Sequence, residues 1–109
     1  MRTLRFIVDK QVISQDPDCD FSGLIPGTKG YLQAEFIFSQ EWKDCVKVAA
    51  FYSRMGKEYP PQALDDNNMC IIPAEALTKS VFSVRIVGKN KSNLRLTTNK
   101  IMVFQNGGN

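Results

Sequence analysis

The 109-residue chain contains no histidine, the side chain that most often serves as general base, proton shuttle and metal ligand. It has three cysteines, Cys19, Cys45 and Cys70, and none belongs to a Cys-x-x-Cys pair. Because disulfide frameworks and zinc sites need an even or clustered set of cysteines, we expect three free thiols. No glycine-rich loop has the spacing of a phosphate cradle. The sequence therefore predicts a protein that is not an enzyme and has no cofactor and no bound metal.

Long apolar runs are also missing, since no stretch approaches the ~20 residues that span a bilayer. The first ten residues alternate charged and apolar side chains, which is unlike a signal peptide. The net charge is only +3, from 14 basic and 11 acidic residues that are mixed along most of the chain. We therefore expect no membrane partner and consider nucleic acid an unlikely one.

The most informative segment that is present runs from Tyr31 to Ser53. Apolar residues occupy every second position from Leu32 to Phe38, which is typical of a half-buried strand. A second strand follows at residues 46–52, with Val46, Val48, Ala50 and Tyr52 on one face. We expect residues 40–45 to form the turn that joins the two strands in one antiparallel sheet.

Further strands are predicted at residues 3–9, 11–14, 69–72, 80–88, 94–97 and 100–104, with a single helical turn after Pro73. This order predicts an all-β fold, an immunoglobulin-like or jelly-roll sandwich of seven to eight short antiparallel strands. One domain should span residues 1–105, and residues 106–109 should form a flexible tail or the start of a linker. The residues expected in the core are Phe6, Phe36, Phe38, Val48, Val84 and Ile86.

Two surfaces are candidates for partner binding. The first is the long loop at residues 15–29, in which Asp16, Asp18 and Asp20 have the spacing that opens a calcium loop. The glycine and the final glutamate of such a loop are both missing, so a solvated acidic loop is the better interpretation. The second surface is residues 58–64, where Tyr59 precedes Pro60 and Pro61. Two prolines restrict this segment to an edge strand or a loop, and both surfaces stay free once the core faces are paired.

Two alternative functions and the role of one tryptophan remain open at this point. Tyr52 and Tyr59, if exposed in a groove, would favour a carbohydrate or host-surface binding module. A small nucleic-acid-binding domain would use the basic cluster of Lys89, Lys91 and Arg95, although a solvated turn is the simpler interpretation. Trp42 either anchors an interface or closes one end of the core.

Several motifs together carry a resemblance to a known family. They are Y-L-x-A-x-F-x-F-S-x-E-W-K at residues 31–43, K-x-A-x-F at 47–51, L-D-D-x-x-x-C-x-I-P at 64–73, F-S-V-x-I-V-G at 82–88 and T-T-N-K-I-x-V at 97–103. With these motifs the chain resembles small virion domains of bacteriophages and prophages of Gram-positive hosts, N-terminal β-sandwich domains of head-fibre or baseplate-associated proteins. The chain departs from that family in its double proline and in its long acidic loop.

The resemblance implies a structural module that docks on the virion or anchors an appendage there. Its implied partners are other virion proteins, with a homo-oligomer expected because virions assemble around symmetry axes. The implied location is the virion, and the bacterial cytoplasm during assembly.

Overall fold

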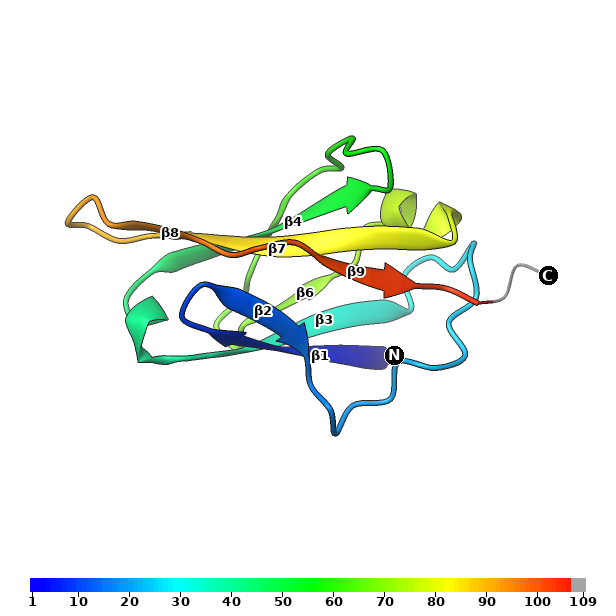
Figure 1. The fold of residues 1–109 in the computed structure, drawn as a ribbon, viewed down its shortest axis with the longest axis horizontal. Helices are drawn as coiled ribbons and strands as arrows, with labels where there is room; N and C mark the ends of the chain where they lie inside the picture. Colours follow the sequence, from blue (N-terminus) through cyan, green and yellow to red (C-terminus); the bar gives the residue numbers. More distant parts are fainter. Residues whose placement is uncertain (107–109) are drawn as a thin grey trace.

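A computed structural model describes residues 1–106, which form two β-sheets packed face to face (Figure 1). Sheet A has the strand order β2-β1-β3-β6, and consists of β1 (Arg2–Asp9), β2 (Val12–Gln15), β3 (Leu32–Phe38) and β6 (Met69–Ile71). Sheet B has the order β5-β4-β7, with β8 and β9 both paired to β7. Its strands are β4 (Val46–Ser53), β5 (Gln62–Ala63), β7 (Val81–Lys89), β8 (Arg95–Thr97) and β9 (Ile101–Phe104). The predicted all-β sandwich is confirmed.

The connection between β3 and β4 differs from the prediction of a hairpin. The two strands lie in different sheets, and the 3₁₀ turn η1 (Gln40–Trp42) carries the chain from one layer to the other. Trp42 explains this crossing, because its side chain is fully buried and its Nε1 donates a hydrogen bond to the carbonyl oxygen of Lys10 at 2.7 Å. The tryptophan therefore closes the core at this end, which is the second of its two predicted roles.

Strand direction in sheet A also differs from a wholly antiparallel arrangement. β1 and β3 are parallel along the whole of β3, with Phe6 opposite Phe36. The reason lies in the loop at residues 16–31, which returns the chain to the starting end of β1 after β2 has paired antiparallel to it. A second short 3₁₀ turn, η2 (Ala74–Thr78), stands where one helical turn was predicted after Pro73.

The core between the sheets contains most of the predicted residues. Phe6, Phe36, Val84 and Ile86 are buried, and Phe38 packs at the margin of the core. The prediction for Val48 is wrong, because this side chain lies partly exposed on the outer face of β4.

The inner face of β4 instead presents Ala49 and Phe51, which are both fully buried. Apolar residues occupy both faces of this strand, so the period of two cannot select the inner one. Tyr52 lies on the outer face, yet it is only 5% exposed because the side chains of Arg85 and Lys100 lie over its ring.

β8 and β9 act as one interrupted strand beside β7. At the interruption, the backbone N–H of Ile86 donates to the hydroxyl of Thr98 at 3.0 Å, and Thr98 N–H donates to the carbonyl of Ile86 at 3.1 Å. The β7–β8 hairpin projects beyond the rest of the sandwich, on the side opposite the N-terminus and the end of β9 (Figure 1).

Two features of the described chain bear on its boundaries. The backbone N–H of Asn106 donates to the carbonyl of Leu24 at 2.8 Å, which ties the first residue of the predicted tail to the loop at residues 15–29. The rest of that tail, residues 107–109, lies outside the described residues. None of the helical segments within residues 1–106 has the length and apolarity needed to cross a membrane.

Candidate binding groove

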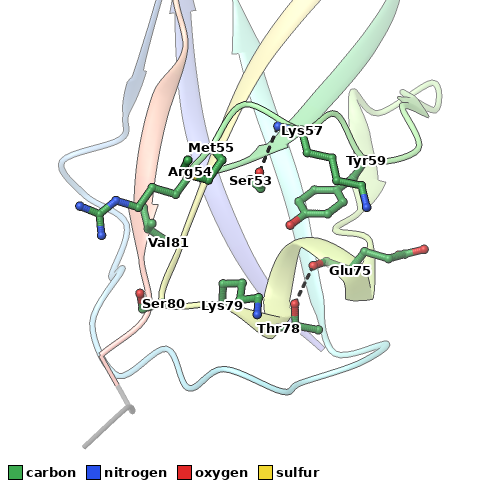
Figure 2. A pocket seen from close by; sticks show the side chains of 10 residues that line it. All are labelled: Ser53, Arg54, Met55, Lys57, Tyr59, Glu75, Thr78, Lys79, Ser80 and Val81. Atoms are coloured by element: carbon green, nitrogen blue, oxygen red, sulfur yellow. Dashed lines mark hydrogen bonds between the residues drawn. The ribbon is translucent and has the colours of Figure 1, made fainter.

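A groove of about 690 Å³ opens at one end of sheet B, between the turn that follows β4 and the 3₁₀ turn η2 (Figure 2). Its lining comes from two segments of the chain, and the residues are Ser53, Arg54, Met55, Lys57, Tyr59, Glu75, Thr78, Lys79, Ser80 and Val81. We refer to it below as the Tyr59 groove. Figure 2 shows the tyrosine ring between the turn and η2, while the guanidinium of Arg54 points away from it.

The turn on one side of the Tyr59 groove is fixed by its own hydrogen bonds. Ser53 N–H donates to the carbonyl of Lys57 at 2.8 Å, and Lys57 N–H donates to the hydroxyl of Ser53 at 3.0 Å. Gly56 has a φ of 92°, a conformation that glycine adopts without steric cost. The turn thereby presents Met55 with 92% of its surface exposed, which is an unusual position for a large apolar side chain.

Tyr59 forms the floor of the groove, and η2 forms the wall across from the turn. Tyr59 N–H donates to the carbonyl of Phe51 at 2.8 Å, and the tyrosine side chain packs partly against the core. On the other side, η2 is held by the buried side chains of Ala76 and Leu77, and Thr78 donates its hydroxyl hydrogen to the carbonyl of Glu75 at 3.0 Å. Both walls are therefore fixed by backbone contacts and core packing, which suits a preformed binding site.

The charges around the groove are mainly positive. Arg54, Lys57 and Lys79 contribute three cations, and Glu75 contributes the single carboxylate. None of these four side chains forms an ion pair within residues 1–106. The arrangement can accept an apolar or aromatic side chain beside Tyr59 and an anionic group at the rim. In the described part of the chain, no three His, Cys, Asp or Glu side chains cluster in the way a metal ion would need.

The predicted acidic loop does not contribute to the groove. The expectation of a fully solvated loop is wrong for Asp16, which is only 8% exposed. Its Oδ2 lies 3.4 Å from Nη1 of Arg5, and its Oδ1 accepts a hydrogen bond from the backbone N–H of Asp18 at 2.9 Å. Asp16 therefore stabilises the loop instead of presenting its carboxylate to a partner.

Asp18 and Asp20 are exposed as predicted. The carboxylate of Asp20 accepts hydrogen bonds from the hydroxyl of Ser22 at 2.6 Å and from the backbone N–H of Ser22 at 2.8 Å, and these bonds lower its pKa below the ordinary value of 3.8. Arg2 reinforces the turn, because its Nη2 donates to the carbonyls of Asp20 and Ser22 at 2.9 and 2.6 Å. The exposed part of the loop is thus ordered by local contacts.

Of the other three predicted residues, Tyr59 lines the groove, while Pro60 and Pro61 are exposed outside it. The predicted edge position of this segment is confirmed, since β5 pairs only with β4 at the border of sheet B. Sequence reasoning missed Met55 and Lys79. The exposed methionine beside Gly56 was a readable signal, but Lys79 joins the groove only through the fold.

All three cysteines are free thiols, as predicted. Burial, with a smaller effect of the Asp65 carboxylate, raises the pKa of Cys70 to about 12. A thiol with such a pKa is almost wholly protonated at neutral pH and is a poor nucleophile.

Comparison of the chain with family models, curated proteins and solved structures finds no match. The resemblance to phage virion domains stays a prediction from the sequence motifs. The geometry of the Tyr59 groove is therefore the main structural indication of function.

Proposed function

We propose that this chain is a non-enzymatic structural module of a bacteriophage particle, which docks on another virion protein or anchors a head fibre or baseplate appendage through the Tyr59 groove. The observation that carries the docking function is the preformed groove itself, with its aromatic floor, exposed Met55 and basic rim. The virion setting and the expected homo-oligomer rest on the family resemblance.

The groove suits a protein segment that inserts one bulky apolar side chain beside Tyr59. Burying such a side chain contributes about 1.5–3 kcal/mol before the costs of association are subtracted. Met55 is well placed to cover the inserted group, because a methionine side chain adapts to irregular surfaces. Lys57 and Lys79 would then favour a carboxylate next to the inserted residue through screened electrostatic attraction.

Incorporation into particles tests this proposal. Met55→Asp places a carboxylate in the apolar part of the groove, and its side chain is too exposed to affect folding. We expect the variant to melt like the wild-type protein but to be incorporated about tenfold less, which corresponds to ~1.4 kcal/mol of lost binding. The matched control is Ile25→Asp, at an apolar residue that is 53% exposed and lies outside the groove.

Two results would contradict the proposal. Particles that contain none of the protein would remove the virion setting. Equal incorporation of Met55→Asp and Ile25→Asp would remove the Tyr59 groove as the docking site, even if the protein is found in particles.

The carbohydrate alternative keeps one supporting observation. Tyr59 lines the groove together with the hydroxyl-bearing residues Ser53, Thr78 and Ser80, and aromatic rings combined with hydrogen-bonding groups suit sugars. Tyr52, the other aromatic candidate, is covered by Arg85 and Lys100 and cannot serve in the same way. Binding of the whole chain to a glycan array, abolished by Tyr59→Ser, would favour this alternative.

A further inference from the structure

The charged residues are distributed unevenly along the chain, and the fold gathers the purely basic part into neighbouring strands of sheet B. All 11 acidic residues lie at or before Glu75. The chain after Glu75 carries only basic side chains, namely Lys79, Arg85, Lys89, Lys91, Arg95 and Lys100. This same stretch forms β7, β8 and β9, which lie together in sheet B. One half of that sheet is therefore built from a segment with no negative charge.

Two of these cations meet over a single tyrosine on the outer face of sheet B. Residues directly opposite each other in paired strands point to the same side of a sheet, and Tyr52 on β4 is opposite Ser83 on β7. The guanidinium carbon of Arg85 lies 5.5 Å from the centroid of the Tyr52 ring. Nζ of Lys100, just before β9, lies 3.8 Å from the same centroid. Both charges are thus held close to one aromatic ring.

Neither cation has an anionic partner within the described residues. The ion pairs found in residues 1–106 both involve Arg5, and none involves Arg85 or Lys100. Nε of Arg85 is buried and donates no hydrogen bond. A guanidinium carries five N–H donors, and leaving donors unpaired away from water costs free energy. Two like charges held at one ring also repel each other, so this arrangement favours an external anion.

We propose that Arg85 and Lys100, held over Tyr52, bind an oxyanion, and that its source is a carboxylate of an acidic segment in a protein partner. The flanking surface supports a protein partner, because Met102 and Phe104 follow Lys100 along β9 and are 55% and 57% exposed. Single-stranded nucleic acid needs aromatic rings free to stack with bases, whereas the Tyr52 ring is only 5% exposed beneath the two cations. This site is separate from the Tyr59 groove, whose lining includes neither cation.

Titration of the isotope-labelled whole chain with a hexaglutamate peptide, followed by NMR, tests the site. Weak screening at about 10 mM salt should allow binding to be detected, and the amide signals of β7 and β9 should shift. The double variant Arg85→Gln/Lys100→Gln should raise Kd about tenfold. The control Lys29→Gln/Lys43→Gln removes two exposed charges elsewhere and should leave Kd within about twofold.

Three other outcomes of the titration would overturn the proposal. Tighter binding of a thymidine oligonucleotide of about twelve residues through the same two cations would show a nucleic-acid site. Inorganic phosphate binding as tightly as hexaglutamate would show a site for a free anion. No shifts at β7 and β9, or equal Kd values for the two double variants, would remove the site. Lys100→Gln alone, at an exposed position, provides the same comparison if the double variant does not fold. A negative result in this titration does not affect the proposed docking function of the Tyr59 groove.

Discussion

The outer face of each sheet carries an arginine, and the two arginines differ in whether a carboxylate pairs with them. At the centre of sheet A, Nε of Arg5 lies 3.1 Å from Glu35 on the neighbouring strand, and its Nη1 lies 3.4 Å from Asp16. The hydrogen bonds to these carboxylates raise the pKa of Arg5. On sheet B, Arg85 lies over Tyr52 and has no carboxylate within reach in residues 1–106. The paired charge of Arg5 stabilises the fold, whereas the unpaired charge of Arg85 beside an aromatic ring is available to a partner.

The largest effect on stability is expected from a substitution in the core, where the inner faces of the two sheets pack together. Phe36→Ala should lower the free energy of unfolding by about 3–5 kcal/mol, because it leaves a cavity beside the stacked ring of Phe6, whose centroid is 5.3 Å away. Phe104→Ala, at an exposed position on sheet B, should cost less than about 1 kcal/mol. Urea denaturation measures both. A cost below about 1 kcal/mol for Phe36→Ala would mean that the inner face of β3 is misassigned.

The next effect concerns the crossing between the layers. A Cβ added at Gly88 would lie 2.7 Å from Cζ3 of Trp42 and 3.3 Å from Cβ of Cys45. Gly88→Ala should therefore destabilise the protein by about 1–3 kcal/mol through overpacking. The double variant Trp42→Leu/Gly88→Ala should lose less free energy of unfolding than the two single variants lose in sum. The smaller indole-free side chain relieves the clash with the added methyl group. Strict additivity would show that Trp42 does not press on β7.

A smaller effect separates the members of the acidic loop. Asp16→Asn should cost about 1–2 kcal/mol, since it removes the charged partner of Arg5 at a largely buried position. Asp18→Asn, two residues away and exposed, should change stability by less than about 0.5 kcal/mol. Thermal and urea melts of the two variants give the comparison. Equal values would show that the contact between Asp16 and Arg5 does not stabilise the loop.

The smallest effect is a dependence on pH. The hydrogen bonds from Ser22 lower the folded-state pKa of Asp20 below 3.8, so the folded state binds a proton less readily than the unfolded chain. The resulting stability is present above pH 3.8 and is lost as the pH falls through the lowered pKa. Asp20→Asn should flatten the acid limb of a stability profile measured from about pH 6 to pH 2, and Ser22→Ala should flatten it partly. Identical profiles for the wild type and Asp20→Asn would contradict this.

Much of the fold followed from local patterns. The strands equivalent to β1, β3 and β7 alternate apolar and polar residues with one inner face, so the sequence alone predicts both their existence and their orientation. β4 carries apolar residues on both faces, and its inner face depends on the sheet that it joins. The assignment of β3 and β4 to different sheets depends on the burial of Trp42, which no local pattern shows.

The candidate sites could be predicted only in part. Tyr59 was recognisable as an aromatic beside prolines on an edge segment. The wall formed by η2 reaches the Tyr59 groove only after folding, because it comes from a segment well separated in sequence. The absence of acidic residues after Glu75 is readable from the sequence. That Arg85 and Lys100 meet over Tyr52 depends on the pairing of β4, β7 and β9, which is a property of the assembled sheet.

The contrast between the two faces is tested most directly by matched substitutions at their central arginines. Arg5→Met and Arg85→Met both keep an unbranched apolar stem and remove the charge. We predict that Arg5→Met lowers the free energy of unfolding by about 1–3 kcal/mol, because Asp16 and Glu35 lose their partner. Arg85→Met should cost less than about 1 kcal/mol, the value of a cation on an aromatic face. A cost for Arg85→Met that equals or exceeds that of Arg5→Met would contradict the assignment of sheet B as the face left free for a partner.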